Sequence, residues 1–174
     1  KLPAWEAELR AAAAKAKQDG TPVPPAPVAP KLRCHDCPSA LYNGMIAPLL
    51  PFSFRGTIWY QGESNGGEAE HYGKVLPMMI KNWRQAFGRE LPFLFVQLPP
   101  YSGTRPEFRE VQNRIARETP GTAAVITTDV GEAKDVHPIR KRPVGERLAL
   151  AARALVYGEA VEYSGPVFKS MKAG

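Results

Sequence analysis

The stretch Gly56-Thr-Ile-Trp-Tyr-Gln-Gly-Glu-Ser-Asn65 decides the fold class of this 174-residue chain. It runs from a short apolar strand directly into a polar loop that contains glycine. A second stretch, Asp135-Val-His-Pro138, places a carboxylate and an imidazole two positions apart, between another apolar strand and a helix. Open α/β sheets build their active sites where strands end in polar loops. The two stretches therefore indicate hydrolytic chemistry at one edge of a sheet.

From residue 57 onward the chain alternates strands with helices. Apolar runs predict strands at 57–60, 93–98 and 122–127, and apolar residues at helical spacing predict helices at 70–87, 106–118 and 143–157. With right-handed crossovers, this order predicts an α/β fold in which a parallel sheet is sandwiched by helices. Three strands are few for a complete fold of this class, so we expect the fold to be incomplete in this chain.

Other regions are less regular. Residues 1–37 are interpreted as a helix over 3–17, which Gly20 ends, followed by an extended proline-rich connector. We expect residues 38–160 to form the α/β domain, and residues 161–174, which show no helical period, to be a tail that leads toward an absent segment.

Two proline-containing segments of the domain are harder to interpret. Pro77 is expected to kink the helix at 70–87 or to mark its late start. Residues 41–54 are apolar but interrupted by glycine and proline, which predicts a short helix or a packed loop.

Charge and composition argue against several classes of function. The net charge is +6, but the basic residues are scattered apart from Arg140-Lys-Arg142, whereas nucleic-acid binders gather them in a stripe. No apolar run approaches the roughly 20 residues of a membrane helix, and no secretory signal pattern opens the chain. We therefore expect no nucleic-acid partner and no membrane span. Cys34, His35 and Cys37 offer fewer than the four ligands of a structural zinc site, which favours a local disulfide or two incidental thiols.

His137 is the strongest candidate for a catalytic residue. Histidine titrates near neutral pH, so it can take a proton from a hydroxyl and return it to a leaving group. Asp135 can accept a hydrogen bond from the ring and fix its tautomer, and Pro138 restricts the backbone of His137 to an extended conformation. The spacing is equally compatible with a loop histidine that caps the next helix or lies in solvent, and both interpretations remain open at this point.

The loop after the first strand supplies a second group of candidates. Gln61 carries an amide N–H suited to a developing oxyanion, and Gly62 allows the backbone to approach a substrate closely. Glu63 is either a general base or a structural acceptor for N–H groups of the loop. Ser64 lacks the second glycine of a Gly-x-Ser-x-Gly turn, so the chain shows no convincing nucleophile.

The segments that carry these candidates resemble one known family. They include Trp59-Tyr-Gln-Gly-Glu-Ser-Asn65, which is the most specific, together with Pro38–Pro48, Val96-Gln-Leu98, Asp135-Val-His-Pro138 and Val144-Gly-Glu-Arg-Leu-Ala-Leu150. The residues of these segments and their order along the chain resemble the sialate O-acetylesterase family within the SGNH, or GDSL-like, hydrolases. The resemblance covers most of the chain from residue 38 onward.

This resemblance implies a three-layer α/β/α fold of the SGNH, flavodoxin-like type. It also implies that O-acetyl esters on sugars are hydrolysed by a Ser-His-Asp mechanism, sialic acid being the name-giving substrate. It implies His137 as the base, Asp135 as its partner, and Gln61 with the Gly62 loop as part of the oxyanion hole. It further implies no metal or other cofactor, an O-acetylated sugar or glycan as the molecule bound, and an extracytoplasmic location, whether periplasmic, secreted or lysosome-like.

The serine of the family stands in a Gly-Gln-Ser-Asn motif that this chain does not contain. We therefore expect residues 38–160 to be the C-terminal part of an SGNH hydrolase domain. The missing N-terminal portion would supply the nucleophile, and this chain alone would be inactive. In the wider superfamily two residues separate the Asp and His, whereas only Val136 does here, so Asp129 is a second candidate for orienting His137.

Two other functions remain open alternatives. One is a non-catalytic carbohydrate-binding or partner module of the same fold. The other is an esterase that acts on acetylated xylan or another plant sugar.

Overall fold

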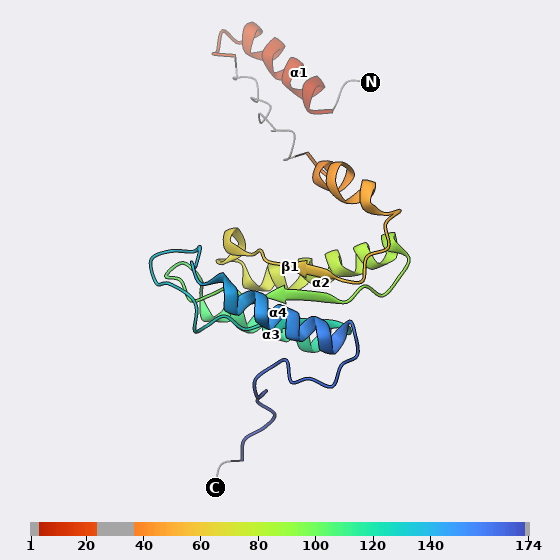
Figure 1. Cartoon of the computed structure of the whole chain (residues 1–174). Helices are drawn as coiled ribbons and strands as arrows, with labels where there is room; N and C mark the ends of the chain where they lie inside the picture. Colours follow the sequence, from red (N-terminus) through yellow and green to blue (C-terminus); the bar gives the residue numbers. More distant parts are fainter. Residues whose placement is uncertain (1–3, 24–36, 173–174) are drawn as a thin grey trace. The chain divides into compact units, whose positions relative to one another are not determined.

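A computed structural model describes residues 4–23 and 37–172 (Figure 1). The chain forms two compact units, one up to Pro48 and one from Leu49 onward. In the first, helix α1 (Ala4–Gln18) ends before Gly20, whose φ of 65° is the left-handed conformation that stops a helix. The N-terminal helix is thus confirmed, whereas the proline-rich connector, with Cys34 and His35, lies outside the described residues.

Short helical turns occupy the first part of the stretch 41–54, in agreement with the short helix predicted as one of two possibilities there. A π-helical turn η2 (Tyr42–Ile46) is followed by a 3₁₀ turn η3 (Ala47–Leu49). Residues 51–56 then lead to the sheet without regular structure.

The second unit has the predicted order of strands and helices. Its elements are β1 (Thr57–Trp59), η4 (Glu63–Asn65), α2 (Ala69–Phe87), β2 (Phe93–Val96), α3 (Pro106–Glu118), β3 (Thr122–Val125) and α4 (Lys141–Leu155). The strands are all parallel in the order β1-β2-β3, with Ile58 opposite Leu94 and Leu94 opposite Ala123. The predicted α/β class with a parallel sheet is therefore confirmed.

Strand β2 lies between two layers of helices (Figure 1). Phe93 and Phe95 pack with α2 and α3, whereas Leu94 packs with α4 on the opposite face. Side chains alternate between the two faces of a strand, and all four residues of β2 are buried. This burial explains why its sequence is a continuous apolar run rather than an alternating one.

The boundaries differ from the predictions in several places. Strand β1 ends at Trp59, one residue earlier than predicted, and α4 ends at Leu155, two residues earlier than predicted. Helix α2 continues through Pro77 without a break, so the late start was wrong. The strands are two residues shorter than predicted at 93–98 and 122–127, because pairing ends at Val96 and Val125. Helix α4 begins at Lys141, two residues earlier than predicted. Pro143 fits there because backbone N–H groups of a first helical turn have no acceptor within the helix.

Strand β1 is an outer strand of the described sheet. Ile58 is aligned with Leu94, so its side chain points to the same face of the sheet. Helix α4 covers that face over β2 and β3, whereas 65% of the surface of Ile58 is exposed. Among the described residues, this part of the outer strand is therefore apolar and uncovered.

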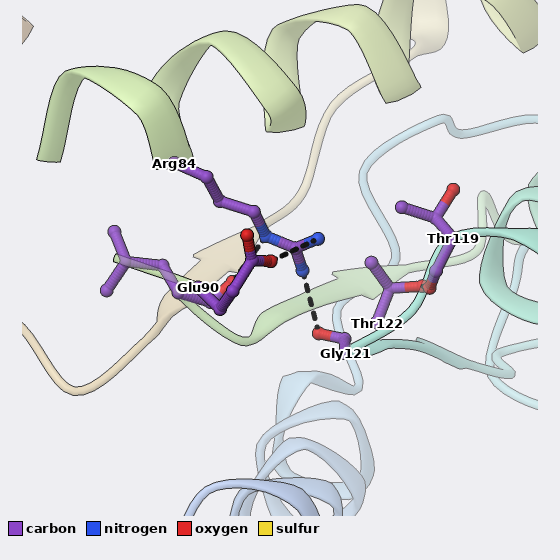
Figure 2. Close-up of polar contacts among 6 residues, drawn as sticks. Arg84, Glu90, Thr119, Gly121 and Thr122 are labelled. Carbon is purple, nitrogen blue, oxygen red and sulfur yellow. Dashed lines mark hydrogen bonds and ion pairs between the residues drawn. The ribbon is translucent and has the colours of Figure 1, made fainter. Parts of the chain in front are cut away.

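Arg84 joins two loops at the edge of the sheet where the strands begin (Figure 2). Its guanidinium donates to the carbonyl oxygens of Leu91 at 2.9 Å and Gly121 at 3.2 Å, and lies 3.5 Å from the carboxylate of Glu90. The entry to β2 is thereby tied to the entry to β3. The contacts at this edge stabilise the fold. The polar loops that could carry chemistry lie at the opposite edge, where the strands end.

Candidate functional site

The loops that follow the three strands open on one edge of the sheet, because the strands are parallel. A contact between residues far apart in the sequence supports this arrangement. Lys141 Nζ, at the start of α4, lies 4.8 Å from the centre of the Tyr60 ring, directly after β1. This cation–π contact joins the end of the His137 loop to the beginning of the Gln61 loop.

The side-chain amide of Gln61 is held at both ends. Its Nε2 donates to Asn65 Oδ1 at 3.0 Å. The hydroxyl of Tyr72 lies 3.1 Å from the backbone oxygen of Gln61 and 3.3 Å from Oε1, so it can donate to either. Since Oε1 faces a donor and Nε2 an acceptor, the orientation of the amide is fixed. One N–H of Nε2 remains for another acceptor, because the bond to Asn65 uses only one of its two hydrogens.

Tyr72 is suited to hold Gln61 because it is itself immobilised. The residue is 4% exposed, and its ring centre lies 4.6 Å from that of Phe108. Burial is the main cause that raises the pKa of Tyr72, so the hydroxyl stays protonated and remains a donor at neutral pH.

Gly62 packs against the core. Its φ is 139°, and a Cβ at this position would lie 3.0 Å from two carbons of the Phe108 ring. Only glycine adopts this backbone conformation readily, and only glycine fits this contact. The loop therefore packs closely against Phe108 of α3, and this contact fixes the position of Gln61, the residue before Gly62.

Glu63 is exposed at the start of η4. Its side chain has no hydrogen bond or ion pair among residues 4–23 and 37–172. The negative charge of Glu63 nevertheless affects Tyr60. The pKa of Tyr60 is raised, mainly because the hydroxyl is partly buried and to a smaller extent because of the charge of Glu63. Ser64, the next residue, is also exposed.

Asp135 and His137 are adjacent in space as well as in sequence. Asp135 Oδ1 accepts a hydrogen bond from the backbone N–H of His137 at 2.8 Å and lies 3.6 Å from its Nδ1. The second distance is longer than a hydrogen bond. The His137 side chain is 82% exposed, so its other nitrogen is open to solvent.

Asp129, the second candidate for orienting His137, is occupied by another partner. Its two carboxylate oxygens accept from Arg147 at 2.7 and 2.6 Å. This paired hydrogen bonding lowers the pKa of Asp129 from 3.8 to about 2. Arg147 also donates to the Ile126 backbone at 2.7 Å, so this ion pair braces the loop after β3. The geometry leaves Asp135 as the better placed partner of His137.

The site is open in the part of the chain that the structure describes. Gln61 and His137 line neither the cavity beside Arg84 nor the cavity between the loops after β2 and β3. Within residues 4–23 and 37–172, no three His, Cys, Asp or Glu side chains gather in a way that could hold a metal ion. None of the described helices is long and apolar enough to cross a membrane.

Two residues of this edge were missed in the sequence. Asn65 was interpreted as the start of a turn, and Tyr72 belonged to the helix predicted at 70–87 without any assigned role. The apolar positions of that helix gave the available signal. Tyr72 lies four residues before Leu76 and eight before Ile80, so it shares their buried face, where a tyrosine hydroxyl needs a partner.

The described residues thus combine a parallel sheet with a His/Asp pair and an anchored amide in the loops at its carboxyl edge. Comparison with known proteins identifies one family. Residues 24–153 match the family described as "Carbohydrate esterase, sialic acid-specific acetylesterase". The chain belongs to this family.

Individual relatives agree with that family. The sialate O-acetylesterase of Mus musculus is 33% identical over 159 residues, and that of Homo sapiens 32% over 154 residues. These alignments cover 77% and 74% of this chain but 29% of each relative. A crystal structure of a carbohydrate acetylesterase from Xanthomonas citri superposes with a TM-score of 0.70 at 44% identity, covering 75% of this chain and 32% of that one. The chain thus spans less than a third of the length of these relatives.

Proposed function

We propose that this chain is the acid–base part of a carbohydrate O-acetylesterase, which hydrolyses O-acetyl esters on sugars. The observation that carries the proposal is the Asp135–His137 pair, with 3.6 Å between Oδ1 and Nδ1. It lies at the sheet edge that also carries the anchored amide of Gln61, in a chain of the acetylesterase family.

The chemistry is acyl transfer. A serine hydroxyl attacks the acetyl carbonyl while His137 takes its proton, and the sugar leaves with that proton from the imidazolium. His137 then takes a proton from water, whose oxygen attacks the acetyl-enzyme, and acetate leaves as the serine regains its proton. The carboxylate of Asp135 stabilises the imidazolium in both halves of the reaction. The free N–H of Gln61 donates to the oxyanion that forms on the acetyl oxygen.

The serine is the part that this chain does not offer convincingly. The relatives are more than three times as long as the matched region, so we propose that an N-terminal portion of the same domain supplies it. Residues 38–160 would then be the C-terminal part of the hydrolase domain, next to the N-terminal region 1–37 and the tail 161–174. The substrate would be an O-acetylated sugar or glycan, met outside the cytoplasm.

Acetate release tests this proposal. The 174-residue chain and a longer form with the preceding segment are each incubated with an aryl acetate and with O-acetylated sialic acid. We expect turnover only from the longer form. There, His137→Asn should reduce kcat by about 10²- to 10⁴-fold, the contribution typical of a general base. His71→Asn is the matched control, because His71 is an exposed histidine on α2.

Two results would contradict the mechanism. If the His137→Asn variant turned over substrate as fast as the unsubstituted protein, His137 would not be the general base. Turnover by the 174-residue chain that Ser64→Ala abolishes would make Ser64 the nucleophile. If the longer form released no acetate yet bound acetylated sugars equally well with and without His137→Asn, the protein would be a non-catalytic binding module instead.

A further inference from the structure

A second feature of the same edge is a cavity of about 430 Å³ between the loops that follow β2 and β3. This volume lies in the range of small-molecule sites, roughly 300–1,000 Å³. Side chains with hydroxyl groups and one cation dominate its lining, namely Tyr101, Ser102, Thr104, Thr128 and Arg109. No carboxylate lines it. A hydroxyl-rich wall with a single positive charge suits a ligand that carries hydroxyl groups and one negative charge.

Arg109 is the cation of this cavity, and it has no acidic partner among the described residues. Its single hydrogen bond from the side chain is a long one, from Nη1 to the Thr104 backbone oxygen at 3.4 Å. A guanidinium has five donors in a planar fork that matches a carboxylate. Most of the hydrogen-bonding capacity of Arg109 is therefore available to a ligand.

Glu107, two residues before Arg109, is exposed and forms no ion pair with it among the described residues. Two further carboxylates, one on α3 and one in the loop after β3, are paired with other arginines. Asp129 is held by Arg147 at 2.6 Å, and Glu110 by Arg117 at 2.7 Å. The other cavity, at the opposite edge, differs in this respect. Its lining includes the carboxylate of Glu90, which lies 3.5 Å from the guanidinium of Arg84. Arg84 already donates hydrogen bonds to two backbone carbonyl oxygens.

The two walls of the cavity are fixed to each other. The backbone N–H of Ser102 donates to the Ala133 oxygen at 3.2 Å, which joins the loop after β2 to the loop after β3. Gly131 allows this contact, since a Cβ there would lie 2.6 Å from Pro100 Cδ. Ala133 stands two residues before Asp135, so the cavity and the proposed catalytic pair belong to the same loop. A sugar held in the cavity would meet the chemistry on that loop.

We propose that this cavity binds the carboxylate-bearing part of a sugar acid, with Arg109 as the residue that pairs with the carboxylate. This inference rests on the proposed function, and it selects an acidic sugar over a neutral one such as xylose. Arg109 would then determine which acetylated sugars are substrates, without taking part in proton transfer.

Binding of the free sugar tests the inference separately from catalysis. N-acetylneuraminate and its methyl ester differ in one charge at the carboxyl group, so they form a matched pair of probes. Dissociation constants are measured by calorimetry or by NMR titration, with the chain and with the longer form that carries the preceding segment. Arg109→Gln is compared with Arg109→Lys and with Arg105→Gln. Arg105 is an exposed arginine next to the cavity that does not line it.

We expect the acid to bind more tightly than its ester, and Arg109→Gln to weaken the acid by about 10- to 100-fold, the loss typical of a hydrogen bond between charged groups. The ester should bind Arg109→Gln unchanged, and Arg105→Gln should bind both probes as the unsubstituted protein does. Arg109→Lys should recover part of the affinity, since it restores the charge without the fork. Thermal unfolding of each variant shows whether it is folded.

Several results would overturn the inference. These are equal affinity for acid and ester, equal effects of Arg109→Gln and Arg105→Gln, and an absence of saturable binding of the acid to both forms of the protein. Failure of the proposed function looks different. If acetate release is absent but charge-dependent binding through Arg109 remains, the sugar-acid site stands and the esterase proposal falls.

Discussion

Replacing Tyr72 by phenylalanine would test how the Gln61 amide is positioned. The change removes one hydroxyl and leaves the ring, which is 4% exposed and packed 4.6 Å from the Phe108 ring. The hydroxyl lies 3.1 Å from the Gln61 backbone oxygen and 3.3 Å from its side-chain oxygen, so its loss leaves two oxygen atoms without this donor. Removing one partner of such a bond costs about 1–2 kcal/mol. For a chain of this size, that cost lowers Tm by roughly 2–8 °C.

Two measurements would check this prediction. Thermal unfolding gives the change in Tm, and the side-chain amide signals of Gln61 in a ¹⁵N NMR spectrum should shift and exchange faster with solvent. Tyr157→Phe is the matched control, because Tyr157 is 62% exposed, and neither quantity should change in it. In the longer form, kcat should fall with little change in KM, since the amide would act on the oxyanion rather than on the bound ester. An unchanged Tm together with an unchanged Gln61 amide would refute the reasoning.

Two further changes follow from the same edge of the sheet. Gly62→Ala should destabilise the protein by about 1–3 kcal/mol in urea unfolding, because alanine is strained at a φ of 139° and its Cβ would press on Phe108. Gly67→Ala, with open space around its Cβ, is the control, and equal effects of the two would count against this account. Asp129→Asn should flatten the pH dependence of stability, because Arg147 lowers the pKa of Asp129 from 3.8 to about 2. The pair's contribution is complete above the higher value and is lost as the pH falls through the lower one, so an unchanged slope in that interval would contradict the prediction.

The order of the elements and their boundaries could be predicted to different degrees. Helix α3 begins and ends at the predicted residues, because Pro106 is preorganised for a first helical turn and the apolar spacing is regular. The strand ends were placed too late, because Gln97 and Leu98 are as buried as the strand residues before them yet lie beyond the paired residues. Burial is visible in a sequence, whereas backbone pairing depends on where the neighbouring strand stops.

The candidate site divides in a similar way. The local pattern predicts Gln61 in the loop after the first strand and His137 in the loop between the third strand and the last helix, and the parallel sheet places these loops at one edge. The competition between Asp129 and Asp135 for His137 could not be settled from spacing. It depends on Arg147, eighteen residues after Asp129 in the sequence, which reaches this carboxylate only because α4 packs on the sheet.

The amino-acid sequence by itself determined the class of this protein: alternating strands and helices, a parallel sheet, and polar loops at its carboxyl edge. It could do so because hydrophobic periodicity and turn residues act over a few neighbouring positions. Only the tertiary structure decided which side chains hold the site together, namely Tyr72 on Gln61, Lys141 on Tyr60 and Arg147 on Asp129. These contacts join elements 11 to 81 positions apart. Their geometry is set by how the helices pack on the sheet, and no local sequence preference records it.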